Sequence, residues 1–127
     1  MKTILIFIMF VSVKNAEIKN ITGTCYQAVK NQCDDSPLLT ASQKKINEHD
    51  PLSHRWIAIS RDLRQFYAFG DTINVSGTKG AIYDGKWIVQ DVMNKRWTKK
   101  IDFLVGKNDY IDKFENLTIS KYIKNEQ

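Results

Sequence analysis

The chain has 127 residues, of which 43% are hydrophobic and 26% are charged, and its formal net charge is +5. This length fits one domain with one core, and the composition is that of a folded globular protein rather than a disordered chain. No period recurs along the sequence, which excludes collagen-like, coiled-coil and repeat architectures.

Residues 1–16, MKTILIFIMFVSVKNA, have the layout of a secretory signal peptide. Lys2 precedes an apolar run broken only by Ser12, and the small residue Ala16 ends the segment. The run is shorter than the roughly 20 apolar residues that a transmembrane helix needs. We therefore expect export to the periplasm, the cell envelope or the medium, with one domain over residues 17–127 and no stable membrane span. A buried N-terminal strand or helix is the alternative.

Removal of residues 1–16 leaves 17 basic and 14 acidic residues. This mild excess is too small to indicate a nucleic-acid partner. It suits a polyanionic surface such as a cell wall.

The two cysteines, Cys25 and Cys33, lie eight positions apart. In an exported protein an even number of cysteines predicts a disulfide. A metal site completed by His49 or His54 is the alternative, but neither histidine has zinc-finger spacing to a cysteine. We expect a Cys25–Cys33 disulfide, surface histidines, no metal and no cofactor.

The first half of the domain predicts two strands separated by loops. Residues 22–28 fit a short strand, and residues 38–46, LLTASQKKI, fit either a helical turn or an extended segment. Residues 56–60 are almost continuously apolar, which predicts a strand buried on both faces. Residues 61–71 then predict a short turn or helix.

The second half has the stronger β signal. Residues 71–75 alternate, so that Ile73 and Val75 share one face. The expected elements that follow are a strand at 81–83, a type I′ turn at Asp84-Gly85, strands at 87–91 and 100–106, and a short helix or closing strand within 108–127. Short strands with glycine-containing turns predict a mainly β fold, either a sandwich or a small barrel with short helical segments.

Three segments together resemble a known family. They are TCYQAVKNQCDDSPLLTASQ, WIAISRDLRQFYAFGDTINV and YDGKWIVQDVMNKRWTKKIDFLVG, within residues 22–106. Their order is similar to that of the three-aspartate (3D) domain, which occurs in bacterial lytic transglycosylase A and is related to rare lipoprotein A-like proteins. The resemblance implies a six-stranded double-psi β-barrel that acts on peptidoglycan or another wall polysaccharide. We expect a monomer.

The chain departs from the family pattern at two places. Ser60 stands where the family has its first aspartate, and the nearest acid is Asp62. The family's "DTG" corner is replaced by Asp91-Val92-Met93-Asn94, which makes a bulkier turn.

Two aspartates carry the expected chemistry. Cleavage of a glycosidic bond needs a carboxylic acid that is still protonated near neutral pH, and a second carboxylate nearby raises the pKa of the first. The resemblance implies Asp91 as general acid/base, Asp102 as the residue that tunes or orients it, and Asp62 as a third member. If Asp91 and Asp102 lie on adjacent strands of a small barrel, their side chains can approach each other. The alternatives are a turn-capping role for Asp91 and a buried ion pair for Asp102.

The connection between the two aspartates is expected to contact the ligand. Trp97 offers a flat apolar surface for a sugar ring, whereas Trp56 and Trp87 sit in strand patterns typical of core residues. The polar residues Asn94, Lys95 and Arg96 are the other expected ligand contacts. Basic residues here either meet the carboxylates of the wall or keep the surface solvated.

Three functions fit the sequence. The first is an exported enzyme that resembles lytic transglycosylases. The second is a non-catalytic barrel that binds wall glycan or supports another protein, which Ser60 and the missing "DTG" corner favour. The third is a disulfide-stabilised interaction module in which the aspartates are structural.

Overall fold

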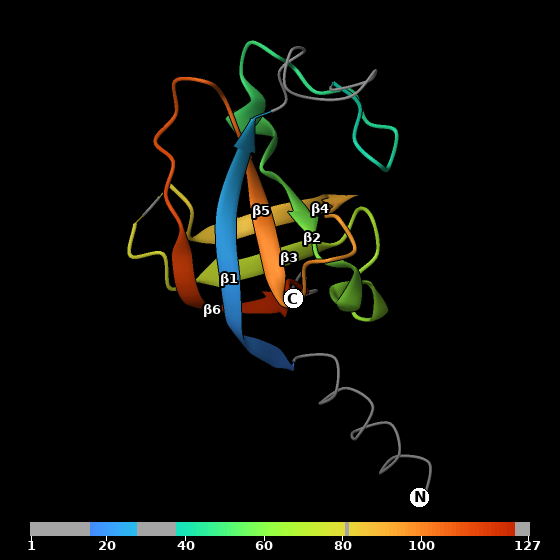
Figure 1. The fold of residues 1–127 in the computed structure, drawn as a ribbon, viewed down its shortest axis with the longest axis vertical. Helices are drawn as coiled ribbons and strands as arrows, with labels where there is room; N and C mark the ends of the chain where they lie inside the picture. Colours follow the sequence, from blue (N-terminus) through green and yellow to red (C-terminus); the bar gives the residue numbers. More distant parts are fainter. Residues whose placement is uncertain (1–15, 28–37, 81, 124–127) are drawn as a thin grey trace, which may run out of the picture.

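The computed structural model describes residues 16–27, 38–80 and 82–123 (Figure 1). The expected signal segment therefore lies almost entirely outside the described residues. Within them the elements are β1 (Glu17–Gln27), η1 (Pro51–His54), β2 (Trp56–Ile59), η2 (Arg61–Gln65), β3 (Thr72–Ser76), β4 (Gly85–Val92), β5 (Lys100–Val105) and β6 (Phe114–Lys121). The two η elements are short 3₁₀ helices, so the predicted mainly β class with short helical segments is confirmed.

The six strands close into a barrel in the order β1-β5-β2-β4-β3-β6. The pairs β1–β5 and β2–β4 are parallel, and the other four pairs are antiparallel. Parallel neighbours cannot be joined by a tight hairpin, and neither parallel pair is consecutive in sequence: β2, β3 and β4 lie between β1 and β5, and β3 lies between β2 and β4. The small six-stranded barrel is confirmed, and the sandwich alternative is wrong.

The pairing has an internal two-fold pattern. Exchanging β1, β2 and β3 for β4, β5 and β6 turns the parallel pair β1–β5 into the parallel pair β2–β4. The same exchange turns the antiparallel pair β1–β6 into β3–β4, and leaves β2–β5 and β3–β6 unchanged. The barrel therefore consists of two interleaved three-stranded halves with the same connectivity.

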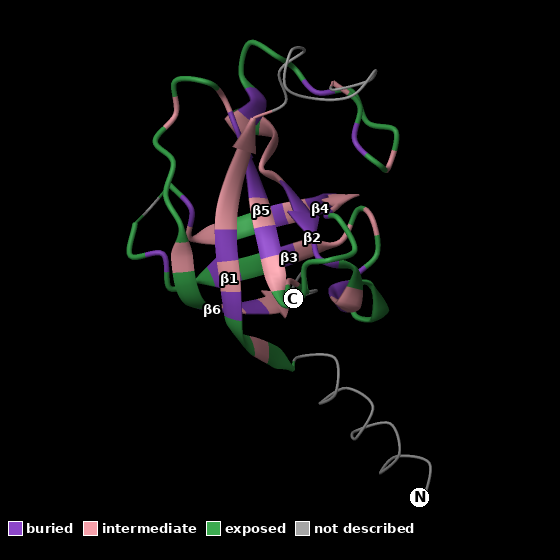
Figure 2. Cartoon of the chain, viewed as in Figure 1, coloured by how far each residue is buried: buried purple, intermediate pink, exposed green. Residues whose placement is uncertain are grey.

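The core fills the inside of the barrel because successive side chains on each strand point to opposite faces. In β3, Ile73 and Val75 are buried while Asn74 and Ser76 are exposed, as predicted (Figure 2). The largest fully buried side chains of this core are Trp87, Phe103, Ile21, Ile57, Ile59, Ile73, Ile101, Leu117 and Ile119.

The predicted core position is confirmed for Trp87, which is fully buried. Its indole Nε1 donates to the carbonyl oxygen of Tyr83 at 2.8 Å. Trp56 is only half-buried, and its ring stacks on His54 with centroids 3.8 Å apart. Trp56 therefore lies on the outer face of the barrel, two positions before Ala58 on the same strand.

The segment 38–46 covers part of that outer face. It folds back on itself, because Leu39 and Lys45 form an antiparallel bridge and the Gln43 N–H donates to the Thr40 carbonyl at 2.9 Å in the turn between them. The segment is therefore neither a helix nor a single extended stretch. Ile46 is buried against Leu104 of β5, and Tyr26 and Trp56 pack on the same small cluster. This cover explains why Leu104 of β5 and Trp56 of β2 are apolar although they lie on the outer face.

Two further predictions concern the turn at Asp84-Gly85 and the C-terminal tail. Gly85 is not part of a two-residue turn but pairs with Val75 as the first residue of β4, so the predicted turn at Asp84-Gly85 is wrong. The longer connection is held by Asp84, whose Oδ1 accepts from the backbone N–H of Thr78 at 2.9 Å. Residues 114–121 form the closing strand β6, so the helical alternative for the tail is also wrong.

Candidate functional site

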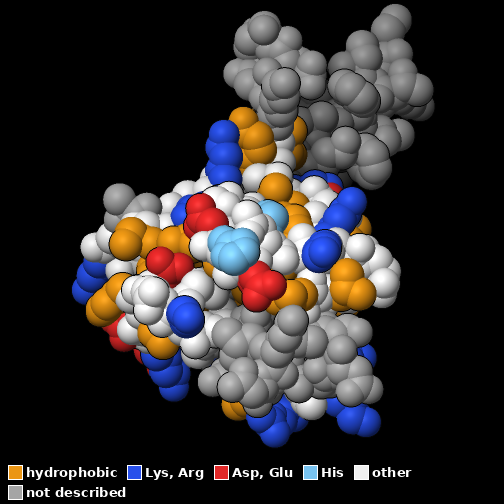
Figure 3. Space-filling view, turned by 90° about the horizontal axis from the view of Figure 1, so that it is seen from above, with side chains coloured by type: hydrophobic (Ala, Val, Ile, Leu, Met, Phe, Trp, Pro, Cys, Tyr) orange, Lys and Arg blue, Asp and Glu red, His pale blue; other side chains and the backbone are white. Residues whose placement is uncertain are grey.

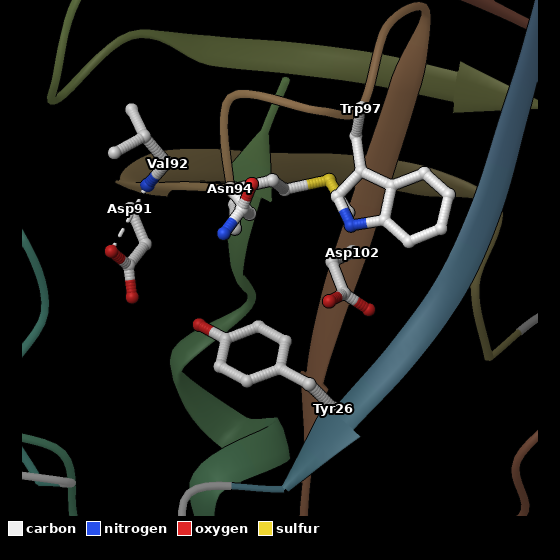
Figure 4. A pocket seen from close by; sticks show the side chains of 8 residues that line it. Tyr26, Asp91, Val92, Asn94, Trp97 and Asp102 are labelled. Carbon is white, nitrogen blue, oxygen red and sulfur yellow. Dashed lines mark hydrogen bonds between the residues drawn. The ribbon is translucent and has the colours of Figure 1, made fainter. Parts of the chain in front are cut away.

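A partly open pocket of about 260 Å³ lies on the outside of the barrel (Figure 4). It is lined by Tyr26, Ala58, Asp91, Val92, Met93, Asn94, Trp97 and Asp102. This volume is just below the range of about 300–1,000 Å³ typical of small-molecule sites. The pocket therefore has room for a small part of a larger ligand that continues over the surface.

The strand register places both expected aspartates beside the same residue. Ala58 of β2 pairs with Asp91 of β4 on one side and with Asp102 of β5 on the other. Thr24 of β1 extends this row beyond Asp102. The two aspartates are not on adjacent strands, because β2 lies between β4 and β5. Two strand spacings separate the backbones by about 10 Å, and the side chain between them is only a methyl group.

A β-bulge turns Asp91 toward the pocket. Along β4, the core residues Trp87 and Val89 alternate, and regular alternation would point Asp91 inward as well. Instead the register with β2 shifts by one residue after Val89, and Gln90 is the extra residue. A bulge of this kind redirects the side chains that follow it, and Asp91 emerges beside Ala58.

Asp102 is the carboxyl group with the more protected surroundings. Burial raises its pKa from 3.8 to about 6, while a hydrogen bond from Thr24 and the positive charge of Lys100 lower it, and the charge of Asp91 raises it slightly further. Thr24 Oγ1 donates to Asp102 Oδ1 at 2.9 Å. The main cause of the raised pKa is therefore desolvation rather than the second carboxylate.

Asp91 is held by backbone amides. Its Oδ1 accepts from the N–H of Val92 and from the N–H of Ala41, both at 3.0 Å. Figure 4 shows its carboxyl group at the opposite end of the pocket from Asp102, with the Tyr26 hydroxyl turned toward the Asp91 side. The two carboxyl groups thus face one space from different environments.

The contact from Ala41 depends on a hydrogen-bonded loop that docks on the bulge. Ser42 Oγ donates to Gln90 Oε1 at 2.7 Å, and the Ser42 N–H donates to the Gln90 carbonyl at 3.2 Å. The Thr40 and Ser42 hydroxyls are 2.8 Å apart, and Thr40 Oγ1 also accepts from the N–H of Lys44 at 3.0 Å. This chain of bonds fixes residues 40–44 against β4.

The β4–β5 connection forms one wall of the pocket. Asn94 and Trp97 line it, as expected for ligand contacts, and the Trp97 N–H donates to the Asn94 carbonyl at 3.0 Å. Arg96 lies against the Trp97 ring, with its guanidinium carbon 4.8 Å from the ring centroid. Lys95 is exposed on the same turn but is not among the lining residues.

Ser60 and Asp62 hold the end of this connection rather than lining the pocket. Ser60 is fully buried, and its Oγ accepts from the N–H of Lys100 at 3.0 Å. Asp62, in η2, accepts from the N–H of Lys99 at 3.0 and 3.3 Å. Lys99 has a left-handed backbone with φ of 49°. Asp62 thus stabilises the turn that leads into β5 and is not brought together with the other two aspartates.

Sequence reasoning assigned no role to four residues that shape the site: Thr24, Tyr26, Ala41 and Ala58. Thr24 and Tyr26 belong to the TCY segment, and Ala41 belongs to the TAS segment, so both segments were visible as parts of the resemblance. Ala58 carried no signal, because a small apolar residue within a strand is ordinary.

The two histidines lie on the upper face of the barrel. Nε2 of His54 accepts from the N–H of Asn47 at 2.9 Å, and His49 is exposed. Figure 3 shows this face, where histidine side chains lie among acidic and hydrophobic ones. Within residues 16–27, 38–80 and 82–123, no group of three His, Cys, Asp or Glu side chains is placed to hold a metal ion.

The predicted disulfide stays a prediction, because Cys33 lies outside the described residues. Cys25 is half-buried on β1, with its Sγ 3.7 Å from the carbonyl oxygen of Asp112. No helix in the described part of the chain is long and apolar enough to cross a membrane.

Comparison of the chain with protein-family models, with curated proteins and with solved structures finds no match.

Proposed function

We propose that this chain is an exported cell-wall protein with a double-psi barrel of the 3D type, which binds a glycan strand in the pocket and cleaves it. Two observations support the double-psi assignment: the closed six-stranded order and the interleaved two-fold pairing of the halves. The barrel alone does not select a reaction, because one fold hosts many activities.

The observation that carries the functional proposal is the convergence of separate segments at one pocket. The TCY segment contributes Tyr26 and Thr24, and the TAS segment contributes the amide of Ala41. Asp91 and Asp102 arrive from β4 and β5. These are the segments on which the family resemblance was based, and they are far apart in sequence.

The surroundings assign the two carboxyl groups different tasks. Asp102, whose pKa is raised to about 6 by burial, is protonated in roughly one molecule in ten at pH 7 and in about half of the molecules at pH 6, and it suits the general acid. Asp91 accepts two amide hydrogen bonds and suits a carboxylate that orients the sugar or stabilises positive charge at its ring. This reverses the roles that the resemblance implies for the pair.

The proposed reaction is intramolecular transglycosylation. Asp102 donates its proton to the glycosidic oxygen, and the bond from that oxygen to C1 of the muramyl sugar breaks. The sugar's own 6-hydroxyl oxygen then bonds to C1 while its proton passes to the Asp102 carboxylate. The products are a free 4-hydroxyl end and a 1,6-anhydro end, and the acid is regenerated.

Digestion of purified peptidoglycan, followed by mass spectrometry, tests the proposal. We expect 1,6-anhydro-muropeptides from the wild type and none from Asp102→Asn, with Asp91→Asn strongly reduced. Asp50→Asn is the matched control, because Asp50 is an exposed carboxylate on another loop. Absence of products from the wild type would remove the catalytic proposal.

A non-catalytic glycan-binding barrel is the second candidate, and the contacts of Asp91 favour it. A carboxylate that already accepts two backbone amides also fits a purely structural role that anchors the TAS segment. Sedimentation with insoluble wall material separates the two candidates. Retention of the wild type without any product would identify a binder.

A further inference from the structure

The basic side chains of the β4–β5 connection are not equivalent. Lys95, Arg96 and Lys99 are exposed, whereas Lys100 is half-buried at the start of β5. Its Nζ lies 3.6 Å from the centroid of the Trp97 ring, which is a close cation–π contact. Because Trp97 lines the pocket, Lys100 brings its charge to the pocket rim.

Lys100 also lies close to the carboxyl group of Asp102. The two residues are two positions apart on one strand, so their side chains leave the same face. The charge of Lys100 accordingly lowers the pKa of Asp102. Figure 4 shows the Trp97 indole beside Asp102 at one end of the pocket.

The backbone of Lys100 is fixed, which presents its ammonium group from an ordered position. Its N–H donates to Ser60 Oγ at 3.0 Å, and its carbonyl accepts from the Ser60 N–H at 2.9 Å. The Trp97 ring then limits the rotamers of the side chain. A cation held in this way loses less conformational entropy on binding an anion than a free surface lysine does.

We propose that Lys100 and the face of Trp97 form a carboxylate-recognition site at the pocket rim, which selects glycans whose sugars carry a carboxylate over neutral glycans. This inference rests on the proposed glycan binding. It names a specificity-determining residue, Lys100, and the chemical group that it binds.

The charges around the pocket also determine the orientation of such a ligand. The groups that face Asp102 are Thr24 and Tyr26 from β1, Asp91 from β4 and Lys100 from its own strand. The two aspartates repel a carboxylate from the middle of the pocket, and Lys100 attracts it to the rim. The acidic group therefore binds beside Trp97, and an uncharged part of the sugar lies against Asp102.

Calorimetric binding of three disaccharides to the purified protein tests the inference. The first is N-acetylglucosaminyl-N-acetylmuramic acid with its free lactyl carboxylate, and the second is the same compound with that group converted to a methylamide. The third carries an alanyl-glutamate dipeptide on the lactyl group, so that its carboxylates lie on the peptide. A preference of about fivefold over the methylamide is the expected size for one partly exposed ion pair. A preference for the first compound supports recognition of the sugar carboxylate, and a preference shown by the dipeptide compound alone overturns it.

Three variants assign the preference to one side chain. Lys100→Gln should abolish it, Lys100→Arg should retain most of it, and Lys107→Gln should leave it unchanged. Lys107 is an exposed lysine beyond the other end of β5, so its variant has the same net charge as Lys100→Gln. None of these substitutions alters the backbone bonds to Ser60.

The outcomes separate this inference from the proposed function. Binding of no disaccharide by the wild type overturns both. Equal binding of all three, or a preference that survives in Lys100→Gln, overturns the carboxylate site and leaves glycan binding intact.

A readout without ligand is the NMR titration of the Asp102 carboxyl carbon, whose pKa should rise in Lys100→Gln and stay unchanged in Lys107→Gln.

Discussion

Replacement of Asp102 by asparagine should stabilise the protein at neutral pH and not at acid pH. The side chains have nearly the same shape, and an asparagine Oδ1 can still accept the hydrogen bond from Thr24. What changes is the charge, which burial in the native state disfavours. The variant therefore isolates the free-energy cost of ionising this carboxyl group inside the folded protein.

The sign and size follow from the two pKa values. The folded value of about 6 lies above the ordinary value of 3.8, so between these pH values the native state binds more protons than the unfolded state. The free energy of unfolding contributed by Asp102 is complete below pH 4 and is lost as the pH rises through 6. At about 1.4 kcal/mol per pKa unit, a shift of about two units corresponds to roughly 3 kcal/mol.

Urea unfolding at pH 4, 5, 6, 7 and 8, followed by tryptophan fluorescence, provides the measurement. Asp102→Asn should match the wild type at pH 4 and exceed its free energy of unfolding by up to about 3 kcal/mol at pH 8. The exposed Asp50→Asn control should stay within about 0.5 kcal/mol of the wild type throughout. An equal difference between Asp102→Asn and the wild type at pH 4 and pH 8 would refute the buried-carboxyl reasoning.

Three other substitutions test the framework of the site. Gly23→Ala places a Cβ 2.7 Å from Leu117 Cδ1, and urea unfolding should show a loss of about 1–3 kcal/mol; an unchanged midpoint would mean that Leu117 moves freely. Ser42→Ala removes the hydroxyl bonded to Gln90, and a loss of about 1 kcal/mol with faster hydrogen exchange in residues 38–46 is expected. Asp62→Ala removes the acceptor of the Lys99 N–H. It should reduce the fraction of protein that sediments with wall material and leave the free energy of unfolding nearly unchanged. A large loss of free energy of unfolding with unchanged sedimentation would contradict the placement of Asp62 outside the core.

The strands of the barrel were predictable because local patterns specify them. Ile73 and Val75 alternate with polar neighbours, and this alternation alone identifies the buried face of β3. Residues 56–60 form a nearly continuous apolar run, which correctly indicated a strand covered on both faces. The covering segment, residues 38–46, was ambiguous because its folded-back form is held by contacts with β4 and β5 as well as by its own hydrogen bonds.

The wrong predictions lie where contacts with other parts of the chain, rather than the local sequence, determine the backbone conformation. Asp84-Gly85 is a frequent hairpin pair, but here Asp84 accepts from Thr78 and closes a longer loop. Gly85 keeps its positive φ of 112° and starts β4. Residues 108–127 fitted either a short helix or a closing strand, yet β1 and β3 each offer an open edge, and β6 pairs with both to close the barrel.

The sequence indicated Asp91 and Asp102 as candidate site residues, but it did not indicate how their side chains are arranged in space. An acid within the apolar strand 100–105 signals a partly buried carboxyl group, and its pKa is raised as that reasoning requires. The position of Asp91 depends on the bulge at Gln90 and on the insertion of β2 between β4 and β5. Both are properties of long-range pairing, which no local window of the sequence contains.

The residue between the aspartates determines whether they form one site. Ala58 is the register partner of both Asp91 and Asp102, and its side chain is a single methyl group on the floor of the pocket. A leucine or phenylalanine there would fill the space between the carboxyl groups and leave them as two unrelated surface acids. On this barrel, a small residue on the central strand lets two aspartates about 10 Å apart in the backbone line one pocket.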